Sequence, residues 1–185
     1  MPDAMKINTP LSDSVIRTLK TGENVLISGV VYTARDSAHK RIIETLERGD
    51  DLPVNLAGQI IYYAGPSPAK PGRVIGSVGP TTACRMDSFT PVLLEIGLKG
   101  MIGKGNRSDD VRRALQEFTA VYFGAIGGAA ALMARCVKKA EIAAYEDLGP
   151  EAIRRLEVIE FPAVVVNDCY GGDLYEQGRS AYKRV

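Results

Sequence analysis

Short runs of β-branched and aromatic residues alternate along this chain with segments of helical periodicity. The clearest pair is VLISGVVY at 25–32, typical of a strand, and the segment 36–48, whose apolar residues share one helical face. Further strands are expected at 59–64, 99–102, 121–126, 141–145 and 158–166, and further helices at 11–19, 82–96, 109–118, 129–137 and 150–156. Regular alternation of this kind predicts an α/β fold.

Single residues refine this outline. Gly29 lies inside the first of these strands, where a glycine often marks a bulge or the close approach of another segment. Pro91 fits the interior of the helix at 82–96 poorly, so a kink or a later start is expected. Ser108 precedes two aspartates and predicts a helix N-cap. Residues 171–185 have little periodicity and are expected to be a loose tail, or ordered only against a partner.

The size and composition favour one ordinary globular domain spanning residues 1–185. The chain is 45% hydrophobic and 24% charged, with a formal net charge of +1. This balance leaves no large basic field for nucleic acid, and no apolar run is long enough to span a bilayer. Residues 1–20 contain scattered polar groups and no apolar signal region, so a cytoplasmic location is expected.

Three cysteines, Cys84, Cys136 and Cys169, need a separate interpretation. Three thiolates with one open iron position would suit a [4Fe–4S] cluster. However, the cysteines lack the close spacing of ferredoxin-type or zinc sites; Cys136 lies in an alanine-rich helical pattern and Cys169 ends a β-rich run. We therefore expect free structural thiols in a reducing compartment, and no metal bound by this chain.

Residues 79–107, GPTTACRMDSFTPVLLEIGLKGMIGKGNR, contain the strongest chemical signal. The polar side chains of interest are Thr81, Thr82, Arg85, Lys104 and Arg107. Hydroxyls donate single hydrogen bonds and a guanidinium donates a planar pair, a combination that suits a carboxylate, while the glycines let a ligand approach closely. The segment GKGNRS lacks the spacing of a phosphate-binding P-loop, which we therefore discount.

A second group of polar residues opens the helix at 36–48. Arg35 directly follows a strand, and strand-to-helix junctions in α/β folds commonly bind ligands. Arg35 and His39 are spaced i and i+4 and can share one face. Arg35 could equally form a surface ion pair with Asp36 or Glu44, and His39 alone is typical of a packing or capping residue.

The residues of the 79–107 segment also have plain structural interpretations. Thr81 or Thr82 could cap the helix that follows, a common role of threonine, and Lys104 could be an exposed turn lysine. A cap needs only one of the two threonines, which leaves the other free. Arg85 lies four residues after Thr81, about one helical turn, so both side chains can face the same space.

Three motifs in a fixed order carry a family resemblance: ARDSAHKR at 34–41, GPTT-x-x-RMD at 79–87 and GKGNR at 103–107. Together with the runs at 58–80 and 121–134, they resemble the C-terminal domain, or separate β subunit, of class I fumarase and L(+)-tartrate dehydratase. The resemblance covers roughly residues 6 to 170. It implies an iron–sulfur hydro-lyase and a single domain of the swivelling β/β/α type.

The resemblance also implies roles for particular residues. The positions matching Thr81, Arg35, Arg85 and Lys104 line the substrate site of that family, with Thr81 as the catalytic base and the three cations binding the dicarboxylate. Four neighbours are expected to support this site: Asp36, His39, Thr82 and Asn106.

The expected cofactor and partners follow from the same resemblance. In that family the [4Fe–4S] cluster belongs to the other domain or to the α subunit, so this chain is expected to bind none and to be inactive alone. The expected partners are a fumarase α subunit, a small dicarboxylate and further copies in a higher-order oligomer. Asn106, Arg107 and Ala34 favour a fumarase that interconverts fumarate and L-malate. A tartrate dehydratase β subunit and a non-catalytic dicarboxylate-binding module are the alternatives.

Overall fold

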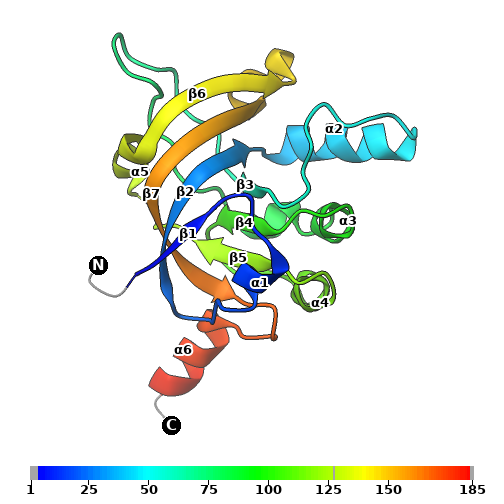
Figure 1. The fold of residues 1–185 in the computed structure, drawn as a ribbon, viewed down its shortest axis with the longest axis vertical. Coiled ribbons are helices and arrows are strands. Elements are labelled where there is room, and N and C mark those ends of the chain that lie inside the picture. The colour runs from blue at the N-terminus through cyan, green and yellow to red at the C-terminus, as the bar shows by residue number, and fades with distance from the viewer. Residues whose placement is uncertain (1–3, 127, 184–185) are drawn as a thin grey trace.

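One seven-stranded sheet runs through the computed structural model, which describes residues 4–126 and 128–183 (Figure 1). The strands are β1 (Met5–Asn8), β2 (Asn24–Thr33), β3 (Ile60–Tyr62), β4 (Gly100–Gly103), β5 (Val121–Gly124), β6 (Val137–Ala144) and β7 (Ile153–Asn167). The α-helices are α1 (Asp13–Ile16), α2 (Asp36–Glu47), α3 (Thr90–Glu95), α4 (Asp109–Glu117), α5 (Ala130–Cys136) and α6 (Leu174–Tyr182). Two 3₁₀ helices complete the set: η1 (Ala83–Met86) and η2 (Glu146–Glu151). Within these described ranges, no helix is long and apolar enough to cross a membrane.

The middle of the sheet closes on itself. Strands β2, β3, β4 and β5 are parallel neighbours, and β7 runs antiparallel to both β5 and β2, so these five strands form a ring. Outside the ring, β1 pairs with the first half of β2, and β6 pairs with the first half of β7. The crossovers between the parallel strands carry α2, α3 and α4, which lie together on one side of the sheet (Figure 1). The predicted α/β class is confirmed.

Side-chain alternation along β3 divides the apolar residues between two cores. Ile60 and Tyr62 belong to the core enclosed by the ring, whereas Ile61 and the following Tyr63 belong to a second core beneath the helices. All residues of β3 and β4 are buried, because one face of each strand meets the ring interior and the other meets α2, α3 or α4.

Several local predictions are confirmed and others are wrong. Pro91 stands in the first turn of α3, and the helix expected at 82–96 is split into η1 and α3. Ser108 caps α4 by accepting a hydrogen bond from the amide of Val111 at 3.3 Å. The helix expected at 150–156 is wrong: η2 ends at Glu151 and β7 begins at Ile153. β1 was not expected from the sequence.

The chain after residue 171 forms α6 rather than a loose tail over residues 174–182. Asp173 caps this helix by accepting hydrogen bonds from two amides of its first turn. Arg112 of α4 donates to Asp173 at 3.1 Å and to Glu176 at 2.6 Å. No residue of α6 is fully buried and Leu174 alone packs against the second core, so polar anchors hold most of the helix, which is why periodicity did not reveal it.

Gly29 marks both a bulge and a close approach, as its position inside a strand predicted. The register of β2 against β7 shifts between Ile27 and Gly29, and Gly29 adopts a φ of +109°. A β-carbon at this position would lie 3.1 Å from the carbonyl oxygen of Thr9 and would also clash with the Thr9 hydroxyl. The segment leading out of β1 therefore packs directly on the backbone of β2.

Gly29→Ala should lower the free energy of unfolding by about 3 kcal/mol, because left-handed strain and overpacking each cost about 1–3 kcal/mol. Gly49→Ala is the matched control: its φ is +72°, but nothing lies within 4 Å of the added carbon. It should cost only about 1 kcal/mol. Urea unfolding of both variants measures the difference, and equal losses would contradict the close-approach argument.

Candidate functional site

The carboxyl ends of three parallel strands bring two predicted cations to one edge of the sheet. Thr33 of β2 pairs with Tyr62 of β3, and Tyr62 pairs in turn with Ile102 of β4. Arg35 and Lys104 each stand two residues beyond these aligned positions. This is the edge at which open parallel sheets commonly bind ligands.

The Thr81–Thr82 segment is inserted between β3 and β4 at this edge. The Thr81 amide donates to the carbonyl of Tyr63 at 2.6 Å, and the Lys104 amide donates to the carbonyl of Thr81 at 3.2 Å. Thr82 and Lys104 form an isolated parallel bridge. Backbone hydrogen bonds therefore hold Thr81 beside Lys104 without using either side chain.

Neither threonine acts as the helix cap that the sequence also allowed. Thr82 occupies the N-cap position of η1, but its side chain makes no capping hydrogen bond. Thr81 lies one residue further from the helix. Thr81 is half-buried at the strand edge, whereas Thr82 is exposed.

Asp36 lies between the two predicted arginines. It accepts a hydrogen bond from Nε of Arg85 at 2.9 Å, while its other oxygen is 3.9 Å from Nε of Arg35. Arg35 also reaches Glu151 at 3.6 Å, and not Glu44. The Nε atom of Arg35 and the second oxygen of Asp36 are buried without a hydrogen bond to any described residue. Two polar atoms of the cluster are therefore buried without a hydrogen bond within the described chain.

Glycine 65 shapes the surface under Arg35. A β-carbon on Gly65 would lie 2.8 Å from a terminal nitrogen of the Arg35 guanidinium. The side chain of Arg35 therefore packs closely against the chain that continues β3. This contact brings Arg35 to the same edge as Thr81, whose amide is bonded to Tyr63 two residues before Gly65.

His39 lies behind the site and does not open onto it. Its side chain is fully buried, and Nδ1 donates to the carbonyl of Arg35 at 2.8 Å. The rings of Tyr63 and Phe89 lie 5.4 Å and 5.9 Å away. Burial lowers the pKa of His39 to about 4, so the imidazole is neutral at neutral pH. His39 therefore fixes the backbone of Arg35, in keeping with a packing role.

Arg107 is buried and binds other residues of the chain. This differs from the sequence-based prediction, which groups it with the side chains that suit a carboxylate ligand. Its guanidinium donates to Asp87 at 2.7 Å, to the Thr90 hydroxyl at 2.7 Å and to the Tyr63 hydroxyl at 3.3 Å. Asp87 also accepts from the amide of Ser108 at 2.7 Å. Because these contacts are buried, Arg107 cannot reach a ligand at the sheet edge.

The loop that carries Lys104 and Asn106 is held at Gly105. The Tyr122 hydroxyl donates to the carbonyl of Gly105 at 3.0 Å, and the Gly105 amide donates to the Tyr175 hydroxyl at 3.2 Å. Lys104 and Asn106 are exposed, and Lys104 makes no ion pair with a described residue. Sequence reasoning missed Tyr175, since nothing in the local pattern connects α6 to a loop 70 residues earlier.

The cysteines form no common site. Cys84 is exposed in η1, Cys136 ends α5 and Cys169 is buried after β7. Among residues 4–126 and 128–183, no group of three or more His, Cys, Asp or Glu side chains is placed to hold a metal ion. Within these ranges, the three thiols and the carboxylates are not arranged as the ligands of an iron–sulfur cluster.

The burial of His39 makes the stability of the fold depend on pH. The unfolded chain binds a proton near pH 6.5 and the folded chain only near pH 4, so stability should fall as the pH drops through this window. The slope approaches about 1.4 kcal/mol per pH unit. In His39→Gln, the slope between pH 5 and 6.5 should be smaller. The free energy of unfolding of both chains is measured by urea unfolding at each pH. If it changed with pH equally in the two chains, His39 would be protonated in the folded chain.

Loss of the buried anchor should be costly. Arg107→Leu leaves Asp87 without its charged partner and should lower the free energy of unfolding by about 3–5 kcal/mol. Arg113→Leu removes an arginine from the exposed pair with Asp110 and should cost about 0–1 kcal/mol. Similar melting temperatures for the two variants would contradict the anchoring role of Arg107.

Residues 2–178 match the family described as Fumarase C-terminus. The chain is 41% identical over 179 residues to fumarate hydratase 1, mitochondrial, of Leishmania major, covering 96% of this chain and 31% of that protein. It is 37% identical over 179 residues to the aerobic class I fumarate hydratase of Salmonella typhimurium, covering 95% and 31%.

A shorter relative is matched over nearly its whole length. This is the "Putative L(+)-tartrate dehydratase subunit beta" of Methanocaldococcus jannaschii, 36% identical over 182 residues, covering 95% of this chain and 93% of that protein. The chain thus spans less than a third of the fumarate hydratases that it matches, but almost all of the separate subunit. From the match over residues 2–178, the chain belongs to the fumarase C-terminus family.

Proposed function

We propose that this chain is the β subunit of a two-subunit class I hydro-lyase that interconverts fumarate and L-malate. The observation that carries the proposal is the meeting of Arg35, Thr81 and Lys104 at one strand edge, in a chain similar to fumarate hydratases. The near-complete match to a protein named as a separate β subunit supports the two-subunit arrangement.

In this proposal the cations bind a dicarboxylate. Lys104 is exposed and has no carboxylate partner within the described chain, so it can accept a substrate carboxylate at little cost. Arg35 and Arg85 share Asp36, and a substrate carboxylate could add charge-assisted hydrogen bonds to both arginines. Arg35 and Lys104 come from different elements at the strand edge that carries Thr81, and in this proposal they bind the two ends of a four-carbon dicarboxylate.

Thr81 would act as the base in the dehydration of L-malate. A threonine hydroxyl is a weak acid, so its alkoxide must be stabilised before it can accept a carbon-bound proton. The nearby cations favour the negative form and would also stabilise charge that develops on the substrate carboxylate. The backbone bonds to Tyr63 and Lys104 would hold the hydroxyl in place during this transfer.

The [4Fe–4S] cluster expected for such an enzyme would be carried by the partner α subunit. The described residues of this chain offer no group of three or more cysteine, histidine or carboxylate side chains placed to hold a cluster. Assembly with the α subunit, and of further copies into a higher-order oligomer, belongs to the same proposal, as does a cytoplasmic location.

A tartrate dehydratase β subunit is the second candidate, favoured by the name of the relative matched over 93% of its length. Asn106 is exposed beside Lys104 and could contact a substrate hydroxyl. Arg107 is buried and could influence the choice of substrate only through the position of this loop. Substrate preference therefore has to be measured.

The experiment is co-expression with the proposed α subunit, followed by assays on fumarate, L-malate, L(+)-tartrate and mesaconate. The complex should hydrate fumarate, and the isolated chain should fold without activity. Turnover by the isolated metal-free chain would contradict the two-subunit proposal. A complex that binds dicarboxylates without converting any of them would favour a non-catalytic binding module.

Thr81→Val keeps the branched shape and removes the hydroxyl. Dehydration of L-malate by the assembled enzyme should fall by roughly 10²–10⁴-fold, the usual effect of losing a general base. Affinity for an unreactive dicarboxylate should change much less, because Arg35, Arg85 and Lys104 remain. Arg85→Ala should weaken that affinity as well. Near-normal turnover by Thr81→Val would remove Thr81 from the catalytic residues.

A further inference from the structure

A cavity of about 550 Å³ lies between the loop of residues 66–77 and helix α5. The loop projects beyond the sheet beside α5 and β6 (Figure 1). Its two limbs are joined by a hydrogen bond from the amide of Ser67 to the carbonyl of Ser77 at 3.0 Å. The side chains that matter most in its lining are Lys70, Arg73, Val74, Ala131 and Arg135.

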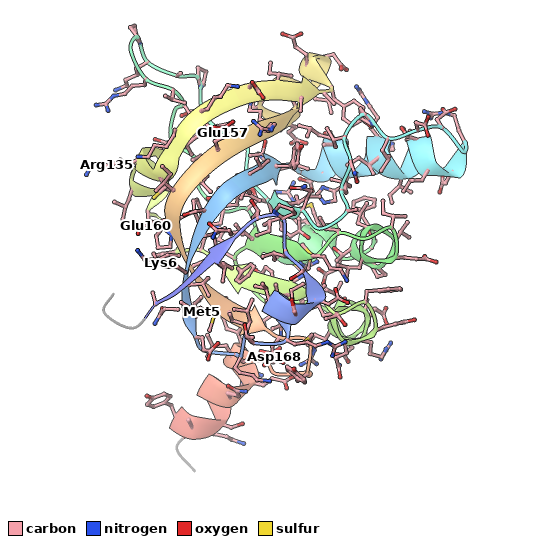
Figure 2. The ribbon with its side chains drawn as sticks, viewed as in Figure 1. Met5, Lys6, Arg135, Glu157, Glu160 and Asp168 are labelled. Atoms are coloured by element: carbon pink, nitrogen blue, oxygen red, sulfur yellow. The ribbon has the colours of Figure 1, made fainter. Side chains whose placement is uncertain are left out.

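The cavity is positively charged. Lys70 and Arg73 reach it from the loop and Arg135 from α5, and no carboxylate lines it among the described residues. None of these cations forms an ion pair within the part of the chain that the structure describes. Figure 2 shows Arg135 at the outer edge of the molecule, beside the end of α5. A surface with this charge is complementary to carboxylates or phosphates.

Exposed apolar side chains lie beside these cations. Val74 of the loop is 51% exposed, and Leu132 of α5 is 53% exposed. Ile126, 64% exposed, precedes α5, where its carbonyl accepts from the amide of Ala129 at 3.4 Å. Single exposed apolar residues are ordinary, but several on one loop–helix surface with unpaired cations are typical of a protein interface.

The surface continues directly into the candidate site. The amide of Val78 donates to the carbonyl of Ala130 at 3.2 Å, and Gly79 lies so close to Ala130 that an added β-carbon would be 3.0 Å away. Thr81 follows two residues later. A protein that covers Thr81 would therefore meet α5 and the loop as well.

We propose that the loop 66–77 and α5 form the docking surface for the α subunit, which presents carboxylates flanked by apolar side chains to it. The inference rests on the proposed two-subunit function. A second protein fits better than a small anion, because the exposed side chains of Leu132 and Ile126 are not part of the cavity lining and a small anion bound there would leave them exposed. The chain spans only 31% of its fumarate hydratase relatives but 93% of a relative named as a β subunit, which supports a separate partner chain.

The test compares two doubly charge-reversed chains for binding to the purified α subunit by titration calorimetry. Arg73→Glu with Arg135→Glu alters the proposed surface, and Lys40→Glu with Arg113→Glu makes the same charge change at exposed cations on α2 and α4. The first pair should raise Kd about 100-fold or more, since like charges would then face each other; the control should stay within about threefold. Leu132→Ser should weaken binding about tenfold at unchanged melting temperature.

The possible outcomes distinguish a failure of the docking surface from a failure of the proposed reaction. Equal affinities of the two double variants, or no complex with the wild-type chain, would overturn the docking surface. A wild-type complex that lacks hydratase activity but dissociates in the first double variant would overturn the reaction and support the surface. Binding of citrate or phosphate to the isolated chain, lost in the first double variant while assembly is unchanged, would assign the cavity to a small anion and overturn the proposal.

Discussion

The buried ion pair between Arg107 and Asp87 connects the two loops from which the candidate site is built. Asp87 follows the segment that carries Thr81, and Arg107 follows the loop that carries Lys104. A charge inside a protein is tolerated only when its hydrogen-bonding groups are satisfied. Arg107 meets this condition through Asp87 and the hydroxyls described above, and its guanidinium lies 5.0 Å from the ring centre of Tyr122. The buried pair of Arg107 and Asp87 therefore fixes the position of the two loops relative to each other.

Much of the fold could be predicted from the sequence, because most elements bury a regular apolar pattern. The first half of β7 escaped prediction for a physical reason. Its residues 153–157 carry three charges, which resemble a helical turn or a loop in isolation. In the fold, Arg155 pairs with Glu141 of β6 and with Glu157 on its own strand, so the charges compensate one another within the sheet. Such compensation depends on a partner strand that no local pattern reveals.

The residues of the candidate site could be predicted from the sequence, but which of them are exposed to a ligand and which are buried could be predicted only in part. Strand register explains why Arg35, Thr81 and Lys104 meet, since each follows a parallel strand or pairs with its extension. Arg107 stands three residues after Lys104 in the same glycine-rich motif, so its sequence context did not separate an exposed cation from a buried one. Only the packing of Tyr63 and Tyr122 around it makes that distinction.

The distribution of charge links the site to its surroundings. The net charge of the chain is only +1, so its positive regions are local. On α4, the carboxylates of Asp109 and Asp110 each pair with an arginine of the same helix. Lys104 and the cations of the loop 66–77 have no such neighbours among the described residues. A fold that neutralises arginines on α4 while leaving Lys104 and the cations of the loop 66–77 unpaired concentrates its positive potential where an anionic substrate and an acidic partner would both arrive. The same distribution can therefore serve both proposed encounters, with α5 joining the two surfaces.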